Sequence, residues 1–93
     1  MVVGSLEIRI LIRESRSLKD RRRVLKSLKD RIRNRFNVSV ADVGDQDTWQ
    51  GTVLGIAVVS NERRFANEVL SKALGVVGGD PRVEIVSQRM TFD

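Results

Sequence analysis

The side chains that could do chemistry in this chain are mostly cations, and they are concentrated in one segment. Residues 13–35 hold eleven of the seventeen Lys and Arg residues and only three acids, a net charge of +8. The other seventy residues carry six cations and nine acids, so the rest of the protein is mildly negative. A localised positive field of this kind favours polyanionic ligands such as nucleic acid.

Groups suited to catalysis or metal binding are scarce. The chain has no His and no Cys, which removes the commonest acid–base group at neutral pH and the usual zinc ligands. No G-x-S-x-G motif occurs, and the glycines at 75–79 lack the Lys-Ser/Thr of a phosphate loop. Asp42, Asp45 and Asp47 do not have EF-hand spacing, so we expect turn and capping roles for them. We therefore predict a binding protein, not an enzyme, with no metal and no cofactor.

The periodicity of the apolar residues predicts six elements in a single domain, 1–93. They follow in the order strand, helix, strand, strand, helix, strand: 2–13, 17–34, 36–43, 51–60, 61–79 and 83–92. Ser17 and Asn61 are the expected N-caps of the two helices. The strand at 51–60 is apolar on both faces and is expected to be central. The order βαββαβ predicts an α+β, ferredoxin-like split βαβ sandwich, an antiparallel sheet with two helices on one face.

The first predicted helix carries a basic band beside its apolar stripe. At about 100° per residue, the stripe contains Leu18, Val24, Leu25, Leu28 and Ile32. The basic band contains Lys19, Arg22, Arg23, Lys26, Lys29 and Arg33. Most neighbours within the band have like charge, and each such pair costs about 0.2–0.5 kcal/mol. We expect the band to bind a polyanion, with a merely solvated surface as the alternative. Arg21 lies near the middle of the stripe and is expected to extend past the sheet edge to water.

Membrane binding fits the sequence poorly. No apolar run approaches the ~18 residues of a membrane span, and the N-terminus does not read as a signal peptide. A membrane-surface helix would need the apolar stripe that this helix uses for its own core. The predicted central strands contain no aromatic residue, so the sheet is not a base-stacking RNA platform. We therefore expect a cytoplasmic protein that binds RNA by charge and shape through the basic band.

The predicted sheet leaves a second candidate surface on the face opposite the helices. Val53, Ala57 and Val59 would form an exposed apolar patch there together with Leu11. A homodimer through this face, or docking of another protein, would cover the patch. Trp49 lies in the turn at 44–50, where it could plug the core, anchor an interface or stack on a base.

Several motifs together resemble a known family. These are SLKDRRRVLKSLKDRIRNRFNVSVADVG (Ser17–Gly44) and QDTWQGTVLGIAVVSN (Gln46–Asn61). They are similar to the bacterial YlxP-like family, a domain of unknown function, over nearly the whole chain. The resemblance implies a ferredoxin-like fold, a bacterial cytosolic protein and a link to ribosomes or RNA, since members are commonly encoded beside transcription and translation factors. It implies no reaction and no functional residues. The expected ligand is structured RNA, with ribosomal RNA as one candidate, and the alternative function is a protein–protein adaptor.

Overall fold

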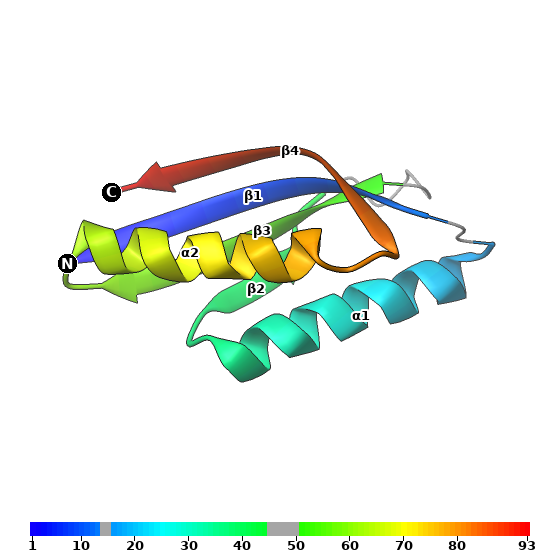
Figure 1. Ribbon diagram of the computed structural model, residues 1–93, viewed down its shortest axis with the longest axis horizontal. Coiled ribbons are helices and arrows are strands. Elements are labelled where there is room, and N and C mark those ends of the chain that lie inside the picture. Colours follow the sequence, from blue (N-terminus) through cyan, green and yellow to red (C-terminus); the bar gives the residue numbers. More distant parts are fainter. Residues whose placement is uncertain (14–15, 45–50) are drawn as a thin grey trace.

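The computed structural model describes residues 1–13, 16–44 and 51–93, which form a four-stranded sheet and two helices (Figure 1). In chain order the elements are β1 (Val2–Ile12), α1 (Leu18–Arg35), β2 (Ser39–Asp42), β3 (Gly51–Ser60), α2 (Arg63–Gly78) and β4 (Val83–Phe92). The predicted order βαββαβ is confirmed.

The sheet has the strand order β2-β3-β1-β4, and all neighbours are antiparallel. β1 pairs along its length with β3 on one side and with β4 on the other, with an irregularity in the β4 register between Arg9 and Ile10. Val3 and Asp93 exchange backbone hydrogen bonds of 3.0 and 2.9 Å, so the two chain ends lie at the same end of the sheet (Figure 1). The predicted ferredoxin-like arrangement and the central place of the strand at 51–60 are both confirmed.

The core lies between one face of the sheet and the two helices. Strict alternation along β1 directs Leu6, Ile8 and Ile10 to this side, and each is 0% exposed. Leu28 of α1 and Leu70 of α2 meet them and are also 0% exposed. Burial of each such aliphatic side chain stabilises the fold by roughly 1.5–3 kcal/mol relative to exposure. We call the opposite side of the sheet the open face, because neither helix packs on it.

Two predicted boundaries are wrong. The second strand begins at Ser39 because Phe36 is the C-cap of α1, with its N–H donating to the Ile32 carbonyl at 2.9 Å. The N-cap of α2 is Glu62 and not Asn61. Ser17, by contrast, caps α1 as predicted, and its Oγ accepts from the Asp20 N–H at 3.1 Å.

The predicted apolar stripe of α1 is shifted at its start. Leu25, Leu28 and Ile32 are buried as expected, but Leu18 is 53% exposed because it occupies the first position of the helix. Arg21 takes its place in the buried surface and is only 5% exposed. The expectation that Arg21 extends to water is therefore wrong.

Candidate nucleic-acid interface

The basic band lies on the flank of α1 that faces β2, the edge strand of the sheet. Arg33 fixes this orientation, because its Nη2 donates to the Val40 carbonyl of β2 at 2.8 Å. Figure 1 shows α1 at the outer edge of the fold, on the side away from β4. The helix thus uses one stripe for the core and presents the band beside it at the molecular edge.

The structure leaves most of the band accessible. Lys29 is half-buried, and the other five members are exposed: Lys19, Arg22, Arg23, Lys26 and Arg33. All six predicted phosphate-binding side chains therefore share one continuous helical surface, as their spacing predicts. Whether they bind RNA remains a prediction.

Asp30 offsets part of this charge. Its carboxylate lies 2.8 Å from Lys26 Nζ and 3.8 Å from an Arg33 nitrogen. The hydrogen bond from Lys26 holds the pKa of Asp30 below its ordinary value, so the group is an anion at neutral pH. The remaining four cations of the band form no ion pair with any described residue: Lys19, Arg22, Arg23 and Lys29. A net positive surface therefore persists after internal pairing.

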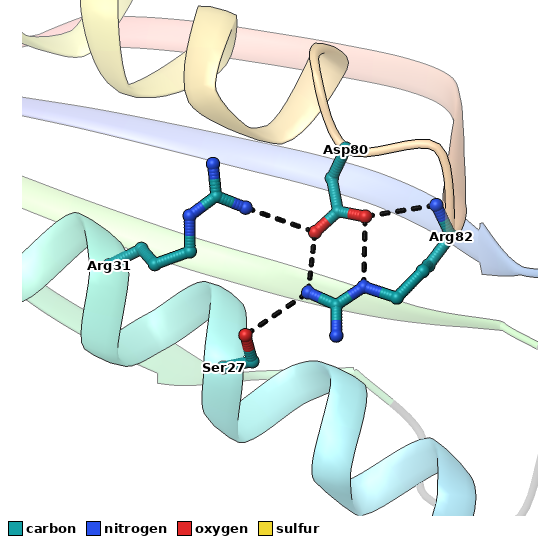
Figure 2. A network of polar contacts seen from close by, with 4 residues as sticks. All are labelled: Ser27, Arg31, Asp80 and Arg82. Atoms are coloured by element: carbon teal, nitrogen blue, oxygen red, sulfur yellow. Dashed lines mark hydrogen bonds and ion pairs between the residues drawn. The ribbon is translucent and has the colours of Figure 1, made fainter.

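The other flank of α1 is held by a buried carboxylate that sequence reasoning missed. Asp80, in the turn between α2 and β4, has a side chain that is 2% exposed. Arg82 donates to it through Nε at 3.0 Å and Nη2 at 2.7 Å, and its backbone N–H adds a bond of 2.9 Å. Arg31 reaches the same carboxylate from α1 at 3.1 Å, and Arg82 also donates to Ser27 Oγ at 3.1 Å (Figure 2). This network ties α1 to the chain reversal that precedes β4.

The contacts of Asp80 indicate a structural role for its carboxylate. The hydrogen bonds from the Arg82 side chain lower the pKa of Asp80 below its ordinary value of 3.8, against the opposing effect of burial. Both oxygens are engaged by guanidinium or amide donors, so the group stays ionised at neutral pH and is suited to hold Arg31 and Arg82 in place. By orienting α1, the network also sets where the basic band faces.

The predicted interface residues of the sheet all lie on the open face, but they do not form one patch. Val53 is half-buried and belongs to an apolar cluster with Leu11, Val43 and Val86, which are 40%, 56% and 52% exposed. Val59 is 65% exposed and lies six residues further along β3, about 20 Å away at strand spacing.

Polar groups separate Val59 from the apolar cluster. Ser5 and Thr91 share a hydrogen bond of 2.6 Å across β1 and β4, and Arg89 and Glu7 form an ion pair of 2.6 Å. Ala57 is exposed and pairs in register with Ser5. The apolar part of the open face is therefore the cluster of Leu11, Val43, Val53 and Val86 at one end.

The remaining candidates concern the turn between β2 and β3. Trp49, Asp45 and Asp47 lie outside the described residues. Asp42 accepts hydrogen bonds from Thr52 Oγ1 and from the Gly44 N–H, the latter at 3.3 Å, which is the turn role expected for it. Over the described ranges, no three acidic, His or Cys side chains come together as metal ligands, and neither helix has the length and apolar character to span a bilayer.

The topology and the helical layer define the class of this protein, a ferredoxin-like α+β domain. Solved structures with this shape include two de novo designed proteins. Foldit4 has a TM-score of 0.55 at 17% identity and covers 97% of this chain and 94% of its own. LFR1 1, designed with a ferredoxin fold, has a TM-score of 0.55 at 13% identity and covers 97% and 85%. At such low identities these likenesses show the fold alone.

Sequence comparison gives the family. A family model described as "Protein of unknown function (DUF503)" matches residues 3–90, and the chain belongs to this family. The chain is similar to the "Uncharacterized protein YlxP" of Bacillus subtilis (strain 168), with 40% identity over 83 residues that cover 89% of this chain and 90% of that protein. The predicted resemblance to the YlxP-like family is confirmed.

Proposed function

We propose that this protein is a non-enzymatic, cytoplasmic RNA-binding protein that holds the phosphates of structured RNA on the basic band of α1. The observation that carries the proposal is the excess of cations in the band: five of its six members are exposed, and four make no ion pair with a described residue. An RNA backbone would relieve the repulsion among them and release its own counterions.

The fold supports recognition by charge and shape. A helix of eighteen residues spans about 27 Å, so one face can follow several consecutive phosphates. The open face offers no platform for stacked bases, because β1 and β3 contain no aromatic residue. The choice of RNA over DNA, and of ribosomal RNA as a candidate, rests on the link to translation that the family resemblance implies.

The experiment that tests the proposal measures binding of the protein to structured RNA across a salt series. Engagement of five or six phosphates would make the logarithm of affinity fall with the logarithm of salt concentration with a slope of about −4 to −5. Single-stranded RNA of equal length should bind less well, because its phosphates are not held in the fixed arrangement that a structured RNA presents to the basic band. A slope near zero, or no binding at 50 mM salt, would contradict the proposal.

We further propose that the open face joins two copies of the chain. The observation that favours this is the apolar cluster, in which three of four side chains are at least 40% exposed. Pairing of two such clusters would remove them from water, and small side chains such as Ala57 and Gly55 allow close approach. A different protein docked on the same face is the adaptor alternative.

Val86→Arg should break this association. The substitution places a charge inside the apolar cluster that the interface would bury, where desolvation costs about 3 kcal/mol or more, so the dimer should weaken at least 100-fold. Sedimentation equilibrium checks the result, with Ser71→Arg on the exposed side of α2 as a control of equal charge. A wild-type protein that is monomeric at high micromolar concentration would rule out self-pairing and favour the adaptor.

A further inference from the structure

The buried guanidinium of Arg21 is an electrostatic anomaly. The residue is 5% exposed, and it forms no ion pair with any described residue. Among the described residues, its buried Nε has no hydrogen-bond partner, and Nη2 reaches only the Gly51 carbonyl, at 3.4 Å. A buried charge is strongly unfavourable unless it is paired and hydrogen-bonded. Within the described chain, nothing compensates this one.

Arg21 lines a groove where further cations gather. The groove has a volume of about 270 Å³ and runs between α1 and the end of β2, and its lining consists of Leu18, Arg21, Arg22, Leu25, Lys29 and Asp42. Arg22 is exposed and Lys29 half-buried, and neither has an ion-pair partner among the described residues. The volume lies below the range typical of drug-sized ligands, so the groove suits a small group.

The net positive charge of the groove fits a phosphate anion. Three cations stand against one carboxylate, that of Asp42, whose Oδ1 is already occupied by the Thr52 hydroxyl and the Gly44 N–H. Guanidinium groups bind phosphate oxygens in a bidentate fashion, and the apolar walls formed by Leu18 and Leu25 would strengthen the attraction by excluding water.

We propose that this groove is a phosphate-binding site, with the Arg21 guanidinium at its base and Arg22 and Lys29 at its rim. The phosphoryl group is either one backbone phosphate of a bound RNA or a free phosphate or phosphomonoester. The site shares Arg22 and Lys29 with the basic band, but Arg21 is not a member of the band. The inference therefore stands or falls separately from RNA binding.

Inorganic phosphate is the probe for the first test, added to the whole chain at constant ionic strength against chloride. At tenfold excess over the dissociation constant, the melting temperature of the wild type should rise by roughly 5–10 °C. Arg21→Met should lose this shift while melting no lower than wild type without phosphate, because it removes an unpaired buried charge and keeps the aliphatic stem. A purely structural role for Arg21 predicts the opposite, a lower melting temperature with the phosphate response intact.

Two further variants keep the test decisive. The double variant Arg22→Met/Lys29→Met alters only the rim and should bind phosphate at least tenfold more weakly in a fold that is intact by circular dichroism. Arg64→Met, on exposed α2, removes one charge far from the groove and should respond to phosphate as wild type does. The absence of a saturable phosphate shift in the wild type, or an equal shift in Arg21→Met, would overturn the proposal.

Competition identifies the source of the phosphate. If the groove takes an RNA phosphate, inorganic phosphate displaces structured RNA at constant ionic strength, and Arg21→Met weakens RNA binding. If it takes a free phosphate or phosphomonoester, Arg21→Met leaves RNA affinity unchanged, and inorganic phosphate lowers that affinity only through the shared Arg22 and Lys29. Both results support the groove, whereas failure of RNA binding together with a retained phosphate shift would count against the proposed function alone.

Discussion

Replacement of Asp80 by Ala should destabilise the protein by about 3 kcal/mol, which lowers the melting temperature by roughly 10–20 °C. The side chain of Asp80 is 2% exposed and accepts four hydrogen bonds from Arg31 and Arg82. Its removal leaves the Arg82 N–H and part of two guanidinium groups without an acceptor, and it releases α1 from the turn before β4. Urea unfolding monitored by circular dichroism measures the loss.

The chain offers a matched control in an exposed ion pair. Glu68 and Lys72 lie 3.3 Å apart on α2, with side chains 53% and 62% exposed. Exposed pairs are worth little because water solvates both partners, so Glu68→Ala should change the free energy of unfolding by no more than about 0.5 kcal/mol. Equal losses for Asp80→Ala and Glu68→Ala would show that the network of Figure 2 is not an anchor.

The pH dependence of stability should show how much of the Asp80 contribution comes from its charge, because Asp80→Asn keeps the shape of the side chain and removes the charge. The pKa of Asp80 is lower in the folded protein than the ordinary value of 3.8, mainly because of the Arg82 hydrogen bonds. The ionised carboxylate therefore contributes fully to the free energy of unfolding at pH values above the ordinary pKa. As pH falls through about 4 and below, the carboxylate binds a proton more readily in the unfolded chain and the contribution is lost. The stability difference between wild type and Asp80→Asn should therefore narrow at acid pH.

Local patterns were sufficient to predict the fold. The alternation of Leu6, Ile8 and Ile10 fixes the inward face of β1, and the apolar run at 51–60 fixes β3 as a central strand. The order of the elements then leaves few ways to build the sheet. Ser17 was recognisable as a cap because its partner, the Asp20 N–H, lies only three residues away.

Contacts between distant residues could not be predicted in this way. Asp80 lies 49 residues from Arg31, and only the packing of α1 beside the turn brings the two together. In sequence, Asp80 had no feature beyond its place before a proline. Arg21 shows the same limit: a helical wheel gives its direction but not how far the sheet extends beneath it.

Spacing alone, by contrast, was enough to pair Asp30 with Lys26. The two lie four residues apart on α1, and the i, i+4 rule applies directly to them. At about 100° per residue, Asp30 falls on the same face of the helix as the band. The net charge of the band is therefore lower than its six cations suggest.

Neutralising three exposed cations of the band should weaken binding of structured RNA by roughly 10²–10³-fold at 0.1 M salt. The variant is Lys19→Gln/Arg23→Gln/Lys26→Gln, which leaves the groove residues Arg22 and Lys29 in place. If each removed cation faces a phosphate, the slope of log affinity against log salt falls by about 2–3. Fluorescence anisotropy across a salt series measures both quantities. The three side chains are exposed, so stability should change little.

A second triple variant controls for net charge. Arg63→Gln/Arg64→Gln/Lys72→Gln removes the same three charges from exposed positions of α2. If RNA were attracted only by the overall charge of the protein, the two variants would lose affinity equally. If the band holds the phosphates, the α2 variant keeps most of its affinity and a salt slope within about 1 of wild type, because screening limits a distant charge to a Debye length of about 10 Å. If the two variants lose affinity equally, the basic band is only a solvated helix surface. The open face of the sheet would then be the better candidate for the functional surface.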